Sequence, residues 1–350
     1  MLKLAGAVGG AVLATQLARH KASAETLPWQ TGGVHAPGSL DYSWLLEKRE
    51  DGVPASPGIT KVLLLAYPRT GSSLLGELLS SSPGTSYFME PLFALMSVGE
   101  LDWEYALEGR VEEGEVPGEA VSSLMEGIYS CDNKVVERLG EWSRVPDTSV
   151  TAVPTKACRS GKAVLTKTVR LHGVQLADAV NRVEDLRVVH LVRDPRGTVA
   201  SLKAQSEEWG GRTGETYCRQ VLADMAVGEQ LGPDRYIRIA YEDLVDRPMD
   251  ILEKIGEFTG IFVTDSMREA VEVRMGGKAK ERSSSVSNQL AATMTTEYYS
   301  TVRAPGHKHD GWKRKLGEQE VAAIECGTCG EMMKRLGYQT IFHRAYRKEL

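Results

Sequence analysis

The sequence has few of the features that would assign it to a membrane, metal or nucleic-acid class. Its apolar N-terminal run, residues 4–18, is shorter than the ~20 residues needed to span hydrocarbon. The formal net charge of −5 disfavours a general nucleic-acid binder, because such proteins are usually basic. The five cysteines include one CxxC pair, Cys326 and Cys329, but no second pair at metal-binding spacing, so no metal site is predicted. N-glycosylation acceptor sites are also absent, which argues weakly against a lumenal protein.

Composition indicates a globular chain with an ambiguous N-terminus. Hydrophobic residues make up 42% and charged residues 25% of the 350 residues, as in folded rather than disordered proteins. Residues 1–21 fit a signal anchor, a cleaved signal peptide or a soluble helix, and composition alone favours none of the three. Residues 22–60 are rich in Gly, Pro, Ser and Ala without sustained periodicity, so we expect a stem or linker there.

The rest of the chain alternates short apolar runs with helical patterns. We expect strands over residues 62–66, 87–89, 163–169, 187–192 and 236–241. Two long helical patterns, residues 121–144 and 321–336, are each predicted to form one helix. Strands that alternate with helices predict an α/β fold with a central parallel sheet, and such sheets bind ligands at the carboxyl ends of their strands.

The most informative stretch is residues 61–79, KVLLLAYPRTGSSLLGELL. An apolar strand is followed by a break at Tyr67-Pro68-Arg69-Thr70-Gly71 and then by leucines at helical spacing. The first turn of a helix carries unpaired N–H groups and a partial positive charge, so a phosphate or sulfate can bind there. The predicted ligands of that anion are Arg69, Thr70, Gly71, Ser72 and Ser73. The alternative is an ordinary strand–helix turn with Ser72 as its N-cap.

This loop departs from the phosphate-binding loop of nucleoside triphosphatases, GxxxxGK[ST]. With Gly71 set on the second Gly, Ala66 replaces the first Gly and Ser72 replaces the Lys. A nucleotide kinase or other P-loop phosphotransferase is therefore disfavoured, but it remains the alternative enzyme class. A catalytically inactive nucleotide- or glycan-binding protein is a third class, which would require loss of the anion ligands.

A second strand–helix junction, residues 186–202, repeats the arrangement. Arg193 follows the strand and can pair with a phosphate in bidentate fashion, and Ser201 follows inside the helix, where its hydroxyl can reach the same anion. The alternative for Arg193 is a salt bridge to Asp194 or to a carboxylate at the sheet edge, and Arg196 is interpreted as structural. Lys167 lies inside an apolar run, where a buried lysine needs a sulfonate, a phosphate or a carboxylate as its partner.

These motifs resemble those of sulfotransferases that use 3′-phosphoadenosine 5′-phosphosulfate (PAPS), in particular the Golgi carbohydrate 6-O-sulfotransferases. The resemblance covers roughly residues 61–338 and rests on the segments YPRTGSSLLGELL, MEP, TKTVR, LRVVHLVRDPRGTVASL, YEDL, GWKRKL and LGY. It implies a three-layer, P-loop-like α/β catalytic domain over residues 61–345. It also implies a single N-terminal membrane anchor and a type II orientation, with the catalytic domain in the Golgi lumen.

The resemblance further implies the reaction. The sulfonate of PAPS, which serves as co-substrate without a metal, is transferred to a hydroxyl of a glycan or glycosaminoglycan. That hydroxyl is expected to be the 6-hydroxyl of galactose, N-acetylglucosamine or N-acetylgalactosamine. Arg193 and Ser201 then correspond to ligands of the 3′-phosphate, and Lys308 lies in a loop that matches a further nucleotide contact only loosely.

Three residues receive catalytic roles from the same resemblance. Arg69, with Lys167, is expected to stabilise the charge that develops on the transferred group. Glu90, the acidic residue of MEP, is the predicted base that takes the proton of the acceptor hydroxyl. The alternatives are that Glu90 only fixes Arg69 or caps a turn, and that His172 is the base.

The resemblance also changes the interpretation of the cysteines. By themselves they fit buried, reduced residues. A Golgi-lumenal enzyme would be disulfide-permissive, and the family-like positions imply the pairs Cys131–Cys158 and Cys218–Cys329, with Cys326 free.

Overall fold

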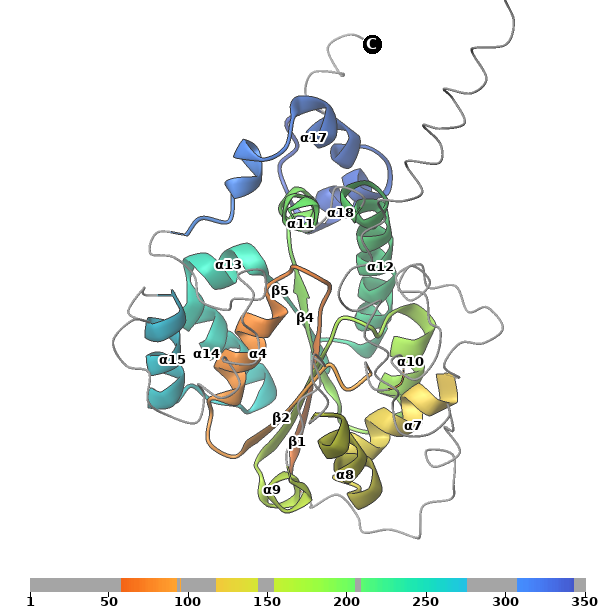
Figure 1. Cartoon of the computed structure of the whole chain (residues 1–350), viewed down its shortest axis with the longest axis vertical. Helices are drawn as coiled ribbons and strands as arrows, with labels where there is room; N and C mark the ends of the chain where they lie inside the picture. The colour runs from red at the N-terminus through yellow and green to blue at the C-terminus, as the bar shows by residue number, and fades with distance from the viewer. Residues whose placement is uncertain are drawn as a thin grey trace, which may run out of the picture. The chain divides into compact units, whose positions relative to one another are not determined.

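Five parallel strands form the middle layer of the computed structural model (Figure 1). The strands are β1 (Thr60–Leu65), β2 (Thr85–Met89), β3 (Ala163–Thr168), β4 (Arg187–Val192) and β5 (Tyr236–Ala240). Their order across the sheet is β2-β3-β1-β4-β5, and each neighbouring pair is parallel. The first strand in the sequence is therefore the central one, and the prediction of a parallel sheet is confirmed.

The structure describes residues 58–92, 95, 118–143, 154–204, 209–275 and 307–342. The predicted anchor, residues 1–21, and nearly all of the predicted stem, residues 22–60, lie outside these ranges. Within the described ranges, no helix is both long and apolar enough to cross a bilayer.

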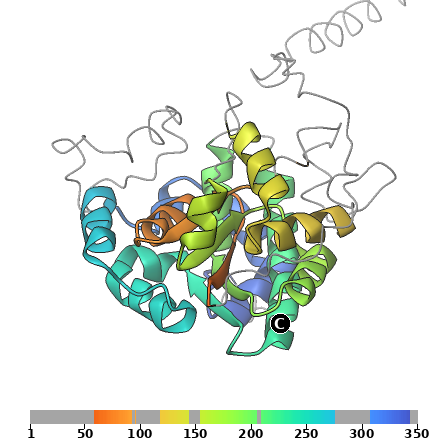
Figure 2. The same cartoon turned by 90° about the horizontal axis from the view of Figure 1, so that it is seen from below.

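Helices surround the sheet on both faces and beyond the carboxyl end of β4. They are α4 (Ser72–Ser80), α7 (Gly118–Tyr129), α8 (Asn133–Trp142), α9 (Thr155–Ser160), α10 (Gly173–Arg182), α11 (Pro195–Lys203), α12 (Trp209–Leu231), α13 (Tyr241–Asp246), α14 (Pro248–Thr259), α15 (Asp265–Met275), α17 (Glu318–Glu325) and α18 (Gly327–Leu336), with the 3₁₀ helix η2 (Gly311–Arg314). In Figures 1 and 2, α4, α14 and α15 lie on one side of the sheet, and α7, α8 and α10 lie on the other.

The side chains of β1 explain this three-layer arrangement. Val62 and Leu64 belong to the hydrophobic cluster that contains α4, α14 and α15, whereas Leu63 and Leu65 belong to the cluster that contains α7, α8 and α10. All four side chains are fully buried. A strand covered on both faces needs apolar residues at every position, which is why its sequence shows a continuous run instead of an alternation.

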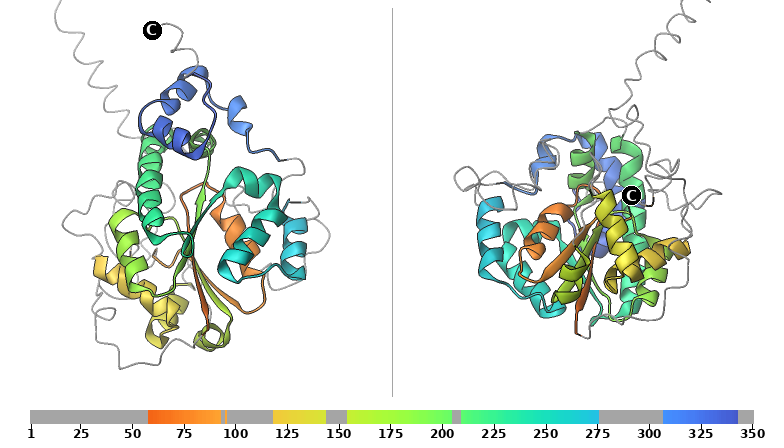
Figure 3. Two further views of the ribbon diagram at one scale, coloured as in Figure 1. Left: turned by 180° about the vertical axis from the view of Figure 1, so that it is seen from behind. Right: turned by 60° about the horizontal axis from the view of Figure 1, so that its bottom comes forward.

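A further group of helices lies beyond the carboxyl end of β4. Two views in Figure 3 and the view in Figure 1 place α11, α17 and α18 together there. α12 packs against both α11 and α18. This group lies beside the loop that carries Arg193, at the sheet edge where ligands were expected.

Two predicted helices are broken in the structure. The predicted helix over residues 121–144, of which residue 144 lies outside the described ranges, is divided into α7 and α8, because Cys131 adopts a positive φ of 52° and the Asp132 side chain accepts a hydrogen bond from Val135 N–H as a new N-cap. Residues 321–336 form α17 and α18, which are separated by extended backbone at Cys326. In each case both halves bury an apolar face, so the hydrophobic pattern continues across the break and conceals it.

Both predicted disulfides are present. Cys131–Cys158 joins the junction of α7 and α8 to α9, and Cys218–Cys329 joins α12 to α18. Cys326 is free and exposed, as expected.

Candidate active site

The loop after β1 has a backbone that few residue types adopt. Arg69 and Gly71 both have positive φ, 66° and 88°. The Thr70 side chain is fully buried, and its hydroxyl donates to the Tyr67 carbonyl oxygen at 2.8 Å and accepts from the Tyr67 N–H at 3.3 Å. Thr70 therefore shapes the loop from inside.

The helix that follows this loop begins with uncapped N–H groups. Gly71, and not Ser72, is the N-cap of α4, so the interpretation of Ser72 as N-cap is wrong. No side chain caps this helix. Ser72 is buried and Ser73 is half-buried in the first turn. The first turn of α4 therefore presents backbone donors and a partial positive charge to an anion.

Tyr241 packs against this loop and was not predicted as a site residue. It opens α13, and a Cβ placed on Gly71 would lie 2.5 Å from its ring. The guanidinium of Arg193 lies 4.4 Å from the centre of the same ring, and the hydroxyl contacts His307 Nε2 at 3.2 Å. Tyr241 is the first residue of the YEDL segment, which could have indicated it from the sequence. The contact between Tyr241 and Gly71, however, depends on tertiary packing.

Arg193 links the two predicted anion-binding loops. Its Nη1 donates to the main-chain oxygen of Arg69 at 2.7 Å, and Arg69 Nε donates to Ser201 Oγ at 3.0 Å. The structure thus brings together three residues that the sequence placed in two separate motifs. Asp194 pairs with Arg196 at 2.7 Å, and this contact takes the place of the alternative pair with Arg193.

Arg193 also retains an unused donor. Its Nε is buried and has no hydrogen-bond partner among the described residues. A Cβ on Gly197 would approach that atom to 2.9 Å, so glycine at this position leaves room for the guanidinium. A buried donor without a partner is unfavourable, and an anionic ligand would satisfy it.

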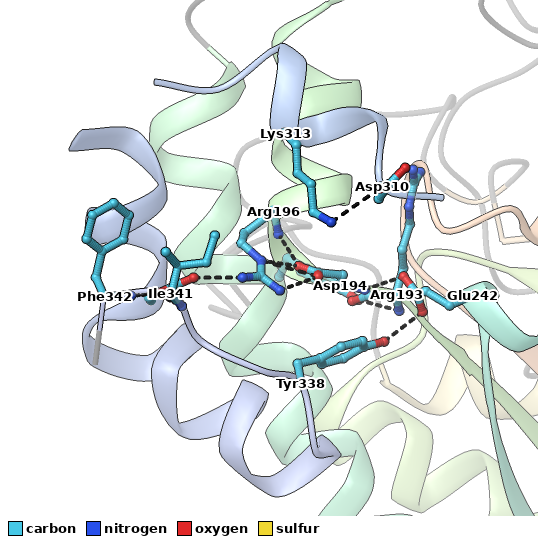
Figure 4. Close-up of polar contacts among 11 residues, drawn as sticks. Arg193, Asp194, Arg196, Glu242, Asp310, Lys313, Tyr338, Ile341 and Phe342 are labelled. Carbon is cyan, nitrogen blue, oxygen red and sulfur yellow. Dashed lines mark hydrogen bonds and ion pairs between the residues drawn. The ribbon is translucent and has the colours of Figure 1, made fainter. Parts of the chain in front are cut away.

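The backbone around Arg193 is held by neighbouring side chains. The Tyr217 hydroxyl accepts from Arg193 N–H at 2.9 Å and donates to Arg193 O at 2.7 Å. Glu242 accepts from Asp194 N–H at 3.0 Å and from the Tyr338 hydroxyl at 2.9 Å (Figure 4). Burial raises the pKa of Glu242 above its ordinary value, which the hydrogen bonds only partly offset.

The buried guanidinium of Arg196 links the start of α11 to the C-terminal part of the chain. The Arg196 guanidinium contacts Asp194 and Glu325, both at 2.7 Å, and lies 4.2 Å from the ring centre of Trp312. Glu325 also accepts from the N–H groups of Ile341 and Phe342, which lie on the Arg196 side of Figure 4. The interpretation of Arg196 as structural agrees with these contacts.

Glu90 forms a second buried charge cluster. The residue is 3% exposed, and its carboxylate contacts Lys167 Nζ at 2.5 Å and also Arg170 Nη1. Burial alone would raise the pKa of Glu90, but the two cations outweigh burial and hold that pKa below its ordinary value. The partner that a buried Lys167 requires is therefore a carboxylate. Arg170, in the TKTVR segment, was not predicted as a site residue.

His172 is engaged on both sides of its ring. Nδ1 contacts Asp224 Oδ2 at 2.7 Å, and Nε2 donates to Val169 O at 3.0 Å. The ring stacks on Tyr67 with 5.0 Å between the centres. With both nitrogens committed to protein oxygens, His172 has no free lone pair for an acceptor hydroxyl, which argues against its role as base.

The last predicted ligand, Lys308, makes no contact with Arg69, Arg193 or Ser201 that the structure records. It is exposed, next to His307, whose ring contacts Tyr241. Within the described ranges, no group of three or more His, Cys, Asp and Glu residues could hold a metal ion.

Comparison with known proteins decides the family. The sequence model of the sulfotransferase family matches residues 62–265, more than half of the chain. The chain belongs to the sulfotransferase family. This sulfotransferase carries both arginine loops, Glu90 and Lys167 within the matched region, and the family prediction is confirmed.

The individual relatives have low sequence identity to this chain. Carbohydrate sulfotransferase 1 of Mus musculus is 25% identical, over 80% of this chain and 79% of the relative. Carbohydrate sulfotransferase 5 of Mus musculus is 23% identical, over 85% and 86%. The crystal structure of mouse sulfotransferase SULT7A1 complexed with PAP aligns with a TM-score of 0.46 at 14% identity, over 83% of this chain and 88% of that chain.

Proposed function

We propose that this sulfotransferase transfers the sulfonate of PAPS to the 6-hydroxyl of galactose, N-acetylglucosamine or N-acetylgalactosamine in a glycan or glycosaminoglycan. The observation that carries the proposal is the convergence of Arg69, Arg193 and Ser201 at the carboxyl ends of β1 and β4. The names of the relatives, carbohydrate sulfotransferases 1 and 5, support a sugar acceptor.

The two loops suit a donor with two separate phosphate groups. The uncapped first turn of α4, with Arg69, Ser72 and Ser73, is the proposed site of the 5′-phosphosulfate. Arg193 and Ser201 are the proposed ligands of the 3′-phosphate, and the unpaired Arg193 Nε supports this assignment. Lys308 is the proposed contact from the loop before η2.

The proposed chemistry is a single displacement at sulfur. The acceptor oxygen forms a bond to sulfur while the bond from sulfur to the 5′-phosphate oxygen breaks, and that oxygen keeps the electron pair. Arg69 and the N–H groups of α4 stabilise the leaving phosphate, as positive groups do in phosphoryl transfer. Glu90 takes the proton of the acceptor hydroxyl.

The charge cluster around Glu90 keeps its carboxylate ionised but also weakens it as a base. Lys167 and Arg170 lower the pKa of Glu90, so the role of base requires that the acceptor hydroxyl replace one of these two cations at the carboxylate. Lys167 also lies at the end of β3, beside β1 in the sheet, where its charge adds to that of the donor loop.

We also propose that the enzyme acts in the Golgi lumen as a single-pass type II membrane protein, with the catalytic domain over residues 61–345. Two disulfides support an oxidising compartment. The proposed anchor lies outside the described residues.

The deciding experiment is transfer of radiolabelled sulfonate from PAPS across a panel of defined glycans. We expect label on glycans with a free 6-hydroxyl and none on matched 6-deoxy glycans. Equal labelling of both sets would contradict the proposed position. Binding of 3′-phosphoadenosine 5′-phosphate (PAP) without transfer to any glycan would contradict the acceptor class, and failure to bind PAP would contradict the donor.

A further inference from the structure

One face of α12 contacts both anion-binding loops. Tyr217 and Asp224 are separated by seven residues, or about two helical turns, so they lie on the same side of the helix. Tyr217 is 3% exposed and Asp224 is fully buried. Neither was assigned a role from the sequence.

Tyr217 holds the loop that carries Arg193. Its hydroxyl makes two hydrogen bonds to one residue, accepting from Arg193 N–H and donating to Arg193 O. Burial raises the pKa of Tyr217 well above its ordinary value, so the hydroxyl keeps the proton that it donates. The direction in which the Arg193 side chain leaves the backbone therefore depends on this hydroxyl.

Asp224 holds the residue that opens the other loop. Its Oδ2 accepts from the Tyr67 hydroxyl at 2.7 Å and contacts His172 Nδ1, while its Oδ1 accepts from Gly173 N–H at 2.7 Å. Tyr67 is two residues before Arg69 and is itself fully buried. A buried carboxylate is costly unless every contact is satisfied, and this one is satisfied by groups that the loop and the β3–α10 junction supply.

Tyr217 also contacts Tyr67, the hydrogen-bond partner of Asp224. The rings of Tyr67 and Tyr217 meet edge to face with 5.0 Å between their centres. The residue after Tyr217, Cys218, forms the disulfide to Cys329 that fixes α12 to α18. One rigid helix therefore contacts the opening of the first loop and the turn of the second.

We infer that Tyr217 and Asp224 are positioning residues, each of which holds one of the two phosphate sites of the donor. Tyr217 acts through Arg193 on the 3′-phosphate site, and Asp224 acts through Tyr67 on the 5′-phosphosulfate site. The inference rests on the proposed function, because that function assigns the two phosphates to the two loops.

The two roles predict different binding signatures. PAP carries both phosphates, whereas adenosine 5′-phosphate (AMP) lacks the 3′-phosphate. By calorimetry on the full chain, Tyr217→Phe should lower the preference for PAP over AMP about threefold to tenfold, with a smaller change in AMP affinity. Asp224→Asn should weaken PAP and AMP by similar factors and leave the preference unchanged.

A matched control separates these effects from loss of stability. The Tyr129 hydroxyl is equally buried and contacts Val62 O and Thr166 Oγ1, in the sheet and not in either loop. Tyr129→Phe should lower the thermal midpoint as Tyr217→Phe does, yet leave both affinities at the wild-type level. In an Arg193→Ala background, Tyr217→Phe should change the preference no further.

The outcomes distinguish this inference from the proposed function. A wild-type protein that does not prefer PAP over AMP would overturn the proposed function. A wild-type preference that survives Tyr217→Phe would overturn the inference alone. If Tyr217→Phe does not fold, Asp224→Asn decides: equal weakening of both nucleotides supports the inference, and weakening confined to PAP overturns it.

Discussion

The guanidinium of Arg193 donates a hydrogen bond of 2.7 Å to the main-chain carbonyl oxygen of Arg69. A side chain from the second loop thus holds the backbone of the first at a residue with positive φ. This hydrogen bond joins the two loops directly. A substitution at Arg193 should therefore affect both proposed phosphate sites.

Truncation of Arg193 tests the proposed 3′-phosphate site. Arg193→Ala removes a charge-assisted contact of about 1.5–3 kcal/mol, so we expect PAP affinity to fall about 10- to 150-fold. AMP affinity should fall less, because Arg69 loses only a supporting hydrogen bond. Calorimetry with PAP and with AMP measures the two affinities. Arg138→Ala, in an exposed pair with Glu141, is the control and should change neither affinity. Unchanged PAP binding in Arg193→Ala would refute the assignment.

Gly71 should tolerate no side chain. Gly71→Ala combines a positive φ of 88° with a Cβ 2.5 Å from the Tyr241 ring, so Tyr241 must move and its contact with Arg193 is disturbed. We expect PAP affinity to fall at least tenfold. Gly232→Ala is the matched control, because Gly232 has φ of 74° with no atom near the added Cβ. It should lower stability by about 1 kcal/mol and leave nucleotide binding unchanged. Similar binding in both variants would show that the Tyr241 contact does not matter.

Glu90→Gln tests the proposed base. The substitution keeps the shape of the side chain and removes its basicity, so kcat should fall about 10²–10⁴-fold while the Kd for PAP stays near the wild-type value. Glu141→Gln, at an exposed helix position, should leave kcat unchanged. Lower PAP affinity with little change in kcat would instead make Glu90 an anchor for Lys167 and Arg170.

We predict that the buried His190 makes the free energy of unfolding decrease at acidic pH. Burial lowers the pKa of His190 to about 4, whereas an unfolded histidine titrates near 6.5. The unfolded state then binds more protons between these values, so stability falls as pH falls from about 6.5 to about 4, by at most ~1.4 kcal/mol per pH unit.

Urea unfolding at pH 7 and pH 5 measures that dependence. His190→Gln should show a smaller difference between the two pH values than the wild type. An unchanged difference in His190→Gln would mean that His190 does not carry this part of the acid sensitivity.

The long-range disulfide should contribute strongly to stability. Cys218 and Cys329 are 111 residues apart, and cross-links that close long loops restrict the unfolded state most. Replacing both with serine should lower the free energy of unfolding by about 2–5 kcal/mol in urea. Cys326→Ser should change it little, because that thiol is exposed and unpaired. Equal losses in the two variants would contradict this account.

The strands were predictable because burial on both faces leaves a clear local signal. Residues 187–192 were predicted with the bounds that β4 has, and both arginine loops follow such strands. The breaks at Cys131 and Cys326 were not predictable, since one backbone turn between two helices that bury similar faces leaves the apolar period intact.

The partners of the site residues were harder to predict than the residues themselves. Tyr217 and Asp224 reach the site only through the packing of α12, so no local pattern indicates them, whereas Tyr241 and Arg170 lie in the YEDL and TKTVR segments but their contacts there are not visible in the sequence. Arg69, Arg193 and Ser201 could be named from two motifs, but their direct contacts depend on the strand order that places β1 beside β4.

The central position of β1 has a consequence for how the chain is made. Thr60 pairs with Ala163 of β3, 103 residues later, and Val62 pairs with Arg187 of β4, 125 residues later. At about 5–20 residues per second, β3 follows β1 out of the ribosome after about 5–20 s, and during that time the apolar strand has neither neighbour. A nascent chain released before residue 163 should therefore aggregate, and folding of the full chain should be slow because its strand pairs are distant in sequence.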